Sequence, residues 1–458
     1  MQKFTFDKIT NHLTTSGFVY PGSDIYGGLA NSWDFGPLGT LLKNHIKTAF
    51  RDHFVRKNKN IVEIEPAIIM NTKVWETTGH VSNFHDPLID CKNCHSRFRA
   101  DELINSKDKD ICCDGKSNEE LSELIKTLDI ACPECGKKDF TSIRQFQMMF
   151  KTFMGVTEEK SNIVYLRPET AQGIFVNFKN VMRSQRMKLP FGICDIGKAF
   201  RNEITPGNYI FRTREFEQME IEFFYSPKDS FNYFNFFKED CLKFLDELGL
   251  KKENLRYRDH AKEELAFYSE ATTDIEYLYP FGWGELMGIA SRTDYDLSRH
   301  GESSKEDLKY LDQETNEKFY PYVIEPSFGV ERLMLAILCD SYDEEQLEND
   351  TRIVMHLNPK LAPYQVAVLP LSKQLAEEGE EVLSIINRRF DSVYDVTGSI
   401  GKRYRREDAI GTPFCVTIDF DTKEDKCVTV RERDSMKQER VKISSLCEYI
   451  QNKIESME

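Results

Sequence analysis

The chain has 458 residues, a formal net charge of −15 at pH 7, 40% hydrophobic residues and 30% charged residues. This composition excludes a disordered chain, and the length predicts two or three domains. The negative charge excludes a global basic field for nucleic acid, so any such contact must be local. With no apolar run near the roughly 20 residues of a membrane span and no signal-peptide layout, we expect a soluble, cytoplasmic protein.

The first 88 residues are predicted to form a helix followed by a strand. Apolar residues recur at helical spacing in LGTLLKNHIKTAFRDHFV, which begins at Leu38. The later stretch IVEIEPAIIM alternates as a strand does and is interrupted at Pro66.

The range 89–160 is polar and carries six of the twelve cysteines, so we interpret it as an insertion into a larger domain. Its two Cys-x₂-Cys pairs, CKNC and CPEC, favour zinc over disulfides in a cytoplasmic chain. Four thiolates can close a tetrahedral, structural site. The predicted zinc ligands are Cys91, Cys94, Cys132 and Cys135. Because the gap between the pairs is long, Cys112, Cys113 or His95 could replace one ligand, and reduced thiols without metal are the alternative.

A charged hairpin is predicted at FRNEITPGNYIFRTREFEQMEIEFF, from Phe200 to Phe224. Arg201 precedes a Pro-Gly turn, Arg212 and Arg214 follow it, and glutamates crowd the second arm. Such residues are rarely buried unless they are paired or bound to a ligand. Because guanidinium groups grip phosphate oxygens and carboxylates attract cations, the mixture fits a binder of a triphosphate and a cationic group. A surface ladder of salt bridges is the alternative.

A strand that enters a helix is predicted in YVIEPSFGVERLMLAILCDSY, near the end of the strand-rich range 161–358. Gly329, just before the helix, allows close backbone approach to a ligand. Arg332 in the first turn opposes the helix dipole, which disfavours it for stability alone. A phosphate at the helix start would explain this arginine, whereas an ion pair with Glu331 is the structural alternative.

From residue 360 onward strands and helices alternate, which predicts a separate α/β domain of about 100 residues. In this region GKRYRRED gathers four basic residues around an aromatic ring, a combination that suits phosphates and an unstacked base. The predicted nucleic-acid contacts are Lys402, Arg403, Arg405 and Arg406, with Arg431 and Arg433 as weaker candidates. A solvated helix face is the alternative.

Together these motifs resemble a known family. FRNE with FRTREFEQMEIEFF resembles motif 2 of the class II aminoacyl-tRNA synthetases, GVER resembles motif 3, and KNKNIVEIEPAI resembles motif 1. RPETAQGIFVNFKNV, GWGELMGIASRTDYDL, EPSFGVERL and GSIGKRYRREDAIGTP resemble the homodimeric glycyl-tRNA synthetases. The resemblance runs through nearly the whole chain. It departs from the general class pattern at motif 3, where Gly329 alone remains of a glycine-rich strand.

The resemblance implies an α+β catalytic domain over residues 1–358, built on an antiparallel sheet of the class II type. The zinc-binding insertion of residues 89–160 lies within it. An α/β anticodon-binding domain over 360–458 is expected to follow. Because motif 1 builds the dimer interface in this class, we expect a homodimer.

The implied reaction joins glycine to tRNA(Gly) in two steps, through a glycyl-adenylate made from ATP with release of pyrophosphate. The implied catalytic residues are Arg201, Glu203 and Arg332. Arg201 bridges the glycine carboxylate and the α-phosphate, while Arg332 and Arg212 hold the far phosphates. Glu203 accepts from the adenine amino group, and Phe216 and Arg332 sandwich the adenine ring. Glu285 is the expected Mg²⁺ ligand, since that hard ion prefers carboxylates.

Two larger sets of binding residues follow from the same resemblance. The implied ATP-binding residues are Arg201, Asn202, Glu203, Phe211, Arg212, Thr213, Arg214, Glu215, Phe216, Glu285, Leu286, Gly329, Val330, Glu331 and Arg332. The implied glycine-binding residues are Arg99, Glu169, Phe216, Glu217, Gln218, Met219, Glu220, Glu325, Pro326, Ser327, Phe328 and Gly329. A glycine pocket must reject a β-carbon and read the ammonium. Strand alternation allows either Glu217 or Glu220 to make that contact, but not both without a bulge.

Two other functions compete with this reading. A synthetase-like protein that has lost catalysis could serve as a nucleic-acid-binding accessory subunit. It would have no physical need for Arg201, Glu203, Arg212 and Arg332 together. A class II ligase for another amino acid would share the C-terminal domain, but not Glu169 and the EPSFG carboxylate.

Overall fold

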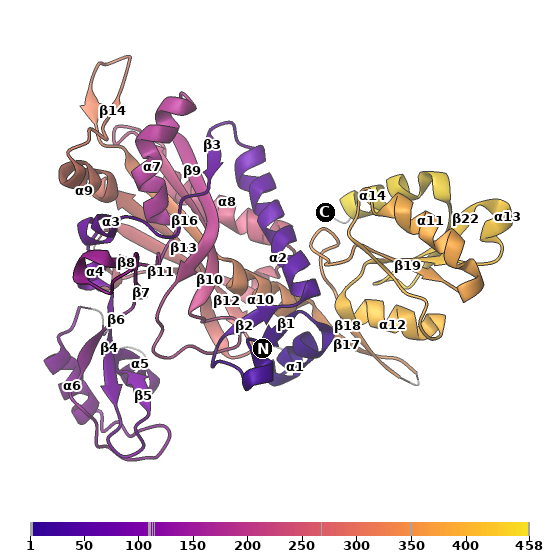
Figure 1. Cartoon of the computed structure of the whole chain (residues 1–458), viewed down its shortest axis with the longest axis horizontal. Helices are drawn as coiled ribbons and strands as arrows, with labels where there is room; N and C mark the ends of the chain where they lie inside the picture. The colour runs from indigo at the N-terminus through magenta and orange to yellow at the C-terminus, as the bar shows by residue number, and fades with distance from the viewer. Residues whose placement is uncertain are drawn as a thin grey trace.

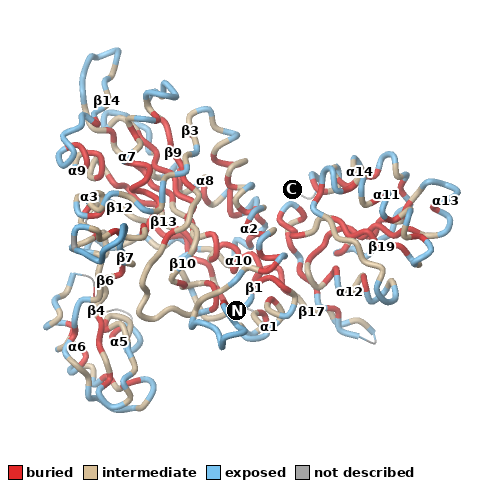
Figure 2. The backbone as a smooth tube through the Cα atoms, in the orientation of Figure 1, coloured by how far each residue is buried: buried red, intermediate tan, exposed pale blue. Residues whose placement is uncertain are grey.

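The computed structural model describes residues 3–108, 111, 113, 115–266, 268–348 and 350–456. A large N-terminal body contains the central sheet, a small lobe projects from it around α6 (Asn118–Thr127), and a separate C-terminal domain follows (Figure 1). Buried backbone runs through the central sheet and through the C-terminal sheet, so each has its own core (Figure 2). Within the described ranges, no helix combines the length and apolar character that crossing a membrane requires.

The central sheet has seven strands in the order β11-β12-β13-β16-β10-β9-β3. All neighbours are antiparallel except β3 and β9, which are parallel. The strands are β3 (Ile61–Ile64), β9 (Phe191–Phe200), β10 (Glu215–Tyr225), β11 (Leu255–Asp259), β12 (Ala271–Tyr279), β13 (Gly282–Thr293) and β16 (Tyr322–Gly329). The expected antiparallel architecture is confirmed.

One face of this sheet packs against apolar helices. Met219, Ile221 and Phe223 of β10 point to this face and join one hydrophobic cluster with the helices. The helices are α1 (Phe6–Ser16), α2 (Pro37–Phe50), α8 (Tyr233–Glu247) and α10 (Val330–Ser341). A π-helical turn over Arg51–Arg56 extends α2, so the predicted helix is present with a change of winding.

The opposite face of the sheet is divided between a core and a cavity. Phe224 at the far end of β10 packs against Phe175 and Phe178 of α7 (Ala171–Ser184). Leu297 of α9 (Tyr295–Ser304) belongs to the same cluster. Nearer the β9–β10 connection, Phe216, Gln218 and Glu220 on this face of β10 line a cavity instead.

The small lobe combines a three-stranded antiparallel sheet with two helices. Its strands are β4 (His85–Asp90), β5 (Arg97–Arg99) and β6 (Arg144–Gln147), and its helices are α5 (Ala100–Lys107) and α6. Ser117 and Glu120 form a capping box that begins α6. Leu103, Ile104, Leu121 and Ile125 make a core separate from that of the main body.

The C-terminal domain is an α/β unit with strand order β20-β19-β21-β22-β23. The strands are β19 (Val366–Pro370), β20 (Ser392–Tyr394), β21 (Phe414–Ile418), β22 (Cys427–Glu432) and β23 (Gln438–Lys442). The helices are α11 (Ala376–Ile386), α12 (Ile400–Ile410), α13 (Thr422–Asp425) and α14 (Leu446–Ser456). The predicted alternation is confirmed, whereas β23 and α13 were not predicted.

Short elements complete the main body. They are β1 (Val19–Pro21), β2 (Trp33–Phe35), α3 (Thr72–Thr77), α4 (His80–Asn83), β7 (Lys151–Phe153), β8 (Ile163–Tyr165), β14 (Tyr310–Leu311) and β15 (Lys318–Phe319). The hairpin of β17 (Tyr342–Gln346) and β18 (Thr351–Met355) connects the main body with the C-terminal domain, where α12 packs on β18.

Candidate active site

A cavity of about 300 Å³ opens on the polar face of the central sheet. Residues of β10, β12, β13 and β16 line it, together with the β9–β10 connection and the first turn of α10. It brings together most of the residues that sequence reasoning selected. The predicted residues that line it are Glu169, Arg201, Glu203, Phe211, Arg212, Thr213, Phe216, Gln218, Glu220, Glu285, Leu286, Glu325, Ser327, Gly329, Glu331 and Arg332.

Three predicted glycine contacts have side chains on the wrong face of the sheet. Glu217 forms ion pairs with Lys43 at 2.6 Å and Lys47 at 3.1 Å, behind the sheet. Met219 and Phe328 are cross-strand partners in the hydrophobic core. Strand alternation separates them from Gln218 and Glu220. The prediction of these side-chain contacts is wrong, and Glu220 is the glutamate that faces the cavity.

The other predicted residues also lie outside the cavity lining. Arg99 is in the lobe, where it pairs with Asp86 at 3.0 Å and Asp101 at 2.6 Å. Arg214 donates to the Ala30 carbonyl, and Glu215 pairs with Lys198 at 2.9 Å on an exposed surface. Val330 and Pro326 are buried in the structure, and the Asn202 backbone donates to the Met148 carbonyl.

The cationic end of the cavity holds three arginines. The Arg201 guanidinium lies 5.4 Å from the Phe216 ring centroid, and that of Arg332 lies 4.5 Å from the Phe211 centroid. Arg332 also contacts the Glu285 carboxylate at 3.1 Å, and its charge holds the pKa of Glu285 below the usual range. Arg212 is engaged by Glu102 from α5 of the lobe. The lobe therefore contacts the cavity rim directly.

Glu203 has an acceptor atom that nothing in the described chain satisfies. Its Oε2 is buried and lacks a hydrogen-bond partner. Buried carboxylate oxygens are normally paired, so this atom is available to a donor on a ligand.

The anionic end of the cavity is built around Glu220. Its carboxylate accepts hydrogen bonds from the Thr170 amide at 2.9 Å, the Thr170 hydroxyl, the Ser327 hydroxyl at 2.7 Å and the Gln218 amide at 3.0 Å. Burial and the charge of Glu169 nevertheless raise its pKa. Burial likewise raises the pKa of nearby Glu325 to about 7. This end therefore carries more carboxyl groups than its own cations offset.

A second layer that sequence reasoning missed holds these carboxylates in place. Arg292 donates to Glu325 at 2.5 Å and forms a fork with Asp296 at 2.8 and 3.0 Å. The Gln172 amide contacts both Asp296 and Glu169. His80 lies 3.3 Å from Glu169. Burial disfavours the ionised form of Glu169, but His80 and Arg292 together hold the pKa of this carboxyl below its usual range.

Other missed residues come from the β11–β12 region. His260, Glu264, Tyr268 and Asp274 also line the cavity. His260 and Asp274 contact each other at 2.7 Å. The alternation in ATTDIEYLY could have placed Asp274 on the cavity face, but no motif marks the others.

Four cysteines of the lobe meet at one point. The Sγ atoms of Cys91, Cys94, Cys132 and Cys135 all lie within 4.8 Å of one another, and two of these contacts are 3.6 Å. Zinc bound tetrahedrally at about 2.3 Å would place thiolates about 3.8 Å apart, so the cluster fits this ion. Cys113 belongs instead to the apolar core of the lobe, and neither it nor His95 is in the cluster. Cys112 lies outside the described residues.

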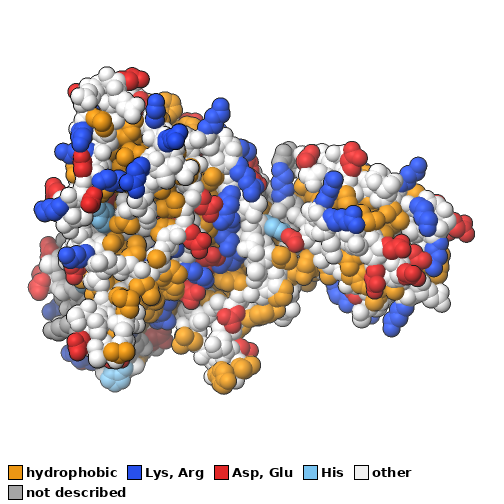
Figure 3. Space-filling view, turned by 45° about the horizontal axis from the view of Figure 1, so that its top comes forward, with side chains coloured by type: hydrophobic (Ala, Val, Ile, Leu, Met, Phe, Trp, Pro, Cys, Tyr) orange, Lys and Arg blue, Asp and Glu red, His pale blue; other side chains and the backbone are white. Residues whose placement is uncertain are grey.

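The basic patch of α12 is partly buried. Arg403 is 1% exposed and donates to the Pro370 and Asp395 carbonyls, so its predicted nucleic-acid contact is wrong. Arg431 and Arg433 are buried as well. Lys402, Arg405 and Arg406 keep accessible surface. The side chains visible in Figure 3 mix both signs of charge over this domain.

Comparison with known proteins agrees with this geometry. The family described as tRNA synthetase class II core domain (G, H, P, S and T) matches residues 150–341, and the anticodon binding domain matches residues 365–453. The solved prolyl-tRNA synthetase from Cryptosporidium parvum, in complex with halofuginone and AMPPNP, superposes with a TM-score of 0.63 at 14% identity, covering 98% of this chain and 75% of that one. This likeness shows the fold.

Closer relatives are curated enzymes of one activity. The glycine–tRNA ligase of Clostridium perfringens is 58% identical over 98% of this chain and 99% of its own length. That of Clostridium acetobutylicum is 59% identical, and that of Geobacillus kaustophilus 58%, each over 98% of this chain and 99% of the relative. The chain therefore belongs to the glycine–tRNA ligase family of class II aminoacyl-tRNA synthetases.

Proposed function

We propose that the cavity on the central sheet activates glycine with ATP, with the phosphates at its arginine end and the ammonium at its carboxylate end. The observation that supports this proposal is that both sets of opposite charge line one cavity of about 300 Å³. Glycine, a zwitterion, and the triphosphate of ATP together require both positive and negative side chains in one cavity.

In the first step a glycine carboxylate oxygen attacks the α-phosphorus, and the bond to the bridging oxygen of pyrophosphate breaks. Pyrophosphate leaves with that electron pair. Arg201 bridges the two reacting groups, and Arg332 and Arg212 hold the far phosphates. Catalysis here is positioning and charge stabilisation. The terminal tRNA hydroxyl then attacks the glycyl carbonyl, and AMP leaves.

The adenine is recognised by Glu203, Phe216 and Arg332. The unpartnered Oε2 of Glu203 suits the exocyclic amino group, which is a donor. Phe216 and Arg332 provide a flat ring and a flat cation for the two faces of the base. Arg201, which now lies near Phe216, would turn toward the α-phosphate.

The glycine ammonium is read by charge rather than by shape. Glu169, Glu220 and Glu325 supply the negative charge, with Ser327 beside them. We propose that close packing around the α-carbon excludes amino acids that have a β-carbon.

Glu285 would hold Mg²⁺, which neutralises phosphate charge when bound. Its side chain is 51% exposed, and Arg332 contacts one oxygen, so carboxylate lone pairs remain for an ion.

The cysteine cluster is proposed to be a structural zinc site. Its support is the convergence of four sulfur atoms in a lobe whose own core is small. Elemental analysis of the purified protein should give about one equivalent of zinc. A Cys132→Ala variant should lose it, whereas less than half an equivalent in the unaltered protein would contradict the proposal.

Lys402, Arg405 and Arg406 are proposed to contact the tRNA anticodon region.

We also propose a homodimer in the cytoplasm. Exposed Ile25, Tyr26 and Leu29 in the loop before β2 give apolar area that a second copy would cover. Light scattering of the purified protein tests the dimer, and a monomer at micromolar concentration would contradict it.

The activity is tested by ATP–pyrophosphate exchange with each amino acid in turn, followed by charging of tRNA. We expect exchange with glycine and transfer of glycine to tRNA(Gly). Exchange without glycine dependence, or no exchange at all, would contradict the proposed use of the cavity.

A further inference from the structure

A fourth glutamate lies beneath the proposed glycine site and has no role in the scheme above. The β10–β16 register pairs Glu220 with Ser327 and Phe223 with Ile324, which brings Glu222 opposite Glu325 on the same face. Glu325 lines the cavity, whereas Glu222 is 0% exposed and lies one layer deeper.

The two carboxyl oxygens of Glu222 are unusual for buried acceptors. Both are buried, and among the described residues neither has a conventional donor. The β10–β16 register places the Glu325 carboxyl opposite them, and its charge contributes to the raised pKa of Glu222. Two ionised carboxylates cannot hold this arrangement, because like charges in a low dielectric repel strongly. One proton between them converts the repulsion into a hydrogen bond.

The surroundings decide which carboxyl carries that proton. Arg292 donates to Glu325 at 2.5 Å, which favours the ionised form of Glu325. Arg292 is aimed there by an irregularity in β13, where the register shifts between Ser291 and Thr293. Burial first, and then the charge of Glu325, raise the pKa of Glu222 well above its usual range. The proton therefore belongs on Glu222, and Glu325 accepts.

We propose that Glu222 is a positioning residue for glycine: a neutral carboxylic acid that donates a hydrogen bond to Glu325 and fixes that carboxylate for the substrate ammonium. Glu325 is then held from two sides, by the Arg292 guanidinium and by the Glu222 hydroxyl. The neutral form of Glu222 also avoids a further buried negative charge among Glu169, Glu220 and Glu325. This inference rests on the proposed role of Glu325 in reading the ammonium.

Two substitutions separate positioning from simple filling of space. Glu222→Gln keeps a donor toward Glu325, and Glu222→Met keeps the length but removes it. In glycine-dependent pyrophosphate exchange, we expect Glu222→Met to raise the KM for glycine about tenfold, which is the loss of one hydrogen bond to a charged group. The KM for ATP should stay unchanged. Glu222→Gln should raise the glycine KM no more than about threefold.

The matched control is Glu407→Gln in the C-terminal domain. Glu407 is also a buried carboxyl whose pKa burial raises to about 7, but it lies in α12, away from the cavity. Its substitution should leave the glycine KM unaltered. An unchanged KM in Glu222→Met, or an equal loss in Glu222→Gln and Glu222→Met, would overturn the proposal.

A spectroscopic measurement covers the case in which Glu222→Met fails to fold. Infrared difference spectra of wild type minus Glu222→Gln at pH 8 should contain the carbonyl stretch of a protonated carboxylic acid. A difference spectrum with carboxylate bands alone would overturn the proposal. Failure of the unaltered protein to exchange pyrophosphate with glycine would instead refute the proposed function, whatever the infrared result.

Discussion

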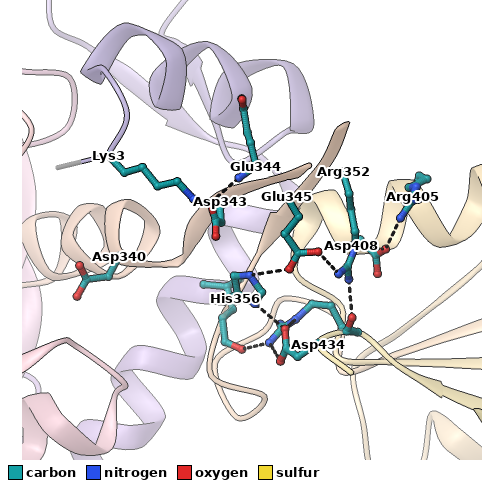
Figure 4. A network of polar contacts seen from close by, with 12 residues as sticks. Lys3, Asp340, Asp343, Glu344, Glu345, Arg352, His356, Arg405, Asp408 and Asp434 are labelled. Carbon is teal, nitrogen blue, oxygen red and sulfur yellow. Dashed lines mark hydrogen bonds and ion pairs between the residues drawn. The ribbon is translucent and has the colours of Figure 1, made fainter. Parts of the chain in front are cut away.

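Two of the buried charge clusters among the described residues differ in how fully their charges are paired. At the junction with the C-terminal domain, Asp408 accepts from Arg352 at 2.8 Å (Figure 4). It also accepts from Arg431 at 2.8 and 3.0 Å. Arg433 donates to the Gly411 and Leu357 carbonyls and to Asp434. Each of these groups is matched by protein partners.

The cavity cluster has the opposite character. Glu169, Glu220, Glu222, Glu325 and Asp296 gather around Arg292. Three of these glutamates have raised pKa values because burial penalises their charge. A buried cluster whose charges are paired can be accommodated in a folded core. An excess of one charge costs free energy unless a ligand of the opposite charge binds there. The same distinction separates Arg201, whose proposed target is a ligand, from Arg403, which donates to the Pro370 and Asp395 carbonyls.

The largest expected effect is at the cationic end of the cavity. Arg201→Ala removes a preorganised donor for the transition-state charge, so glycine-dependent exchange should fall about 10³-fold. The substitution removes a hydrogen bond to the Pro168 carbonyl and contacts with two aromatic rings. We expect the loss of these contacts to lower the melting temperature only slightly. Arg183→Ala on α7, outside the cavity lining, is the control. A variant that keeps full exchange would show that Arg201 is structural, like Arg403.

The junction cluster should respond in stability instead. Asp408→Asn removes the carboxylate that pairs with Arg431 and one of the two that pair with Arg352, whose other partner is Glu345. The loss should cost about 3–5 kcal/mol in the free energy of unfolding of the C-terminal domain. Exchange, measured well below the melting temperature, should stay within about twofold, because the cavity is unaltered.

Urea denaturation followed by circular dichroism measures this loss. Glu306→Gln, which breaks an exposed pair with Lys179, is its control and should cost about 0.5 kcal/mol or less. Equal effects of the two substitutions would remove the distinction between the clusters.

The pH dependence of glycine binding gives a smaller effect. Glu325, with a pKa of about 7, is anionic above that pH and neutral below it. The glycine ammonium is charged throughout this range, so attraction is present at pH 8 and lost as the pH falls. The glycine KM should rise about tenfold between pH 8 and pH 6, following the anionic fraction of one carboxyl.

Steady-state exchange at constant ionic strength, with the ATP KM measured in parallel, checks this dependence. Glu220, Glu222 and Arg292 face the same carboxyl and set its titration. A flat glycine KM would mean that Glu325 does not read the ammonium.

The features that sequence reasoning predicted well depend on local pattern. Alternation in β10 separated Glu217 from Glu220, and the Cys-x₂-Cys spacing selected four cysteines that do converge. Strand and helix periodicity gave the C-terminal domain. Misplaced and missed residues depend on long-range packing. The residues next to Arg403 in the chain do not indicate that the Pro370 carbonyl accepts a hydrogen bond from it. The irregularity that directs Arg292 toward Glu325 forms only when β13 pairs with β16.

We expect the ammonium of glycine to offset the excess of carboxyl groups in the cavity. The most direct test compares pyrophosphate exchange with glycine and with glycolate, which has a hydroxyl in place of the ammonium and the same carboxylate. We predict exchange with glycine that exceeds that with glycolate by about 10⁴-fold, since a site built for a charged donor rejects an analogue without it. Equal exchange with the two acids would contradict the proposed role of the carboxyl groups.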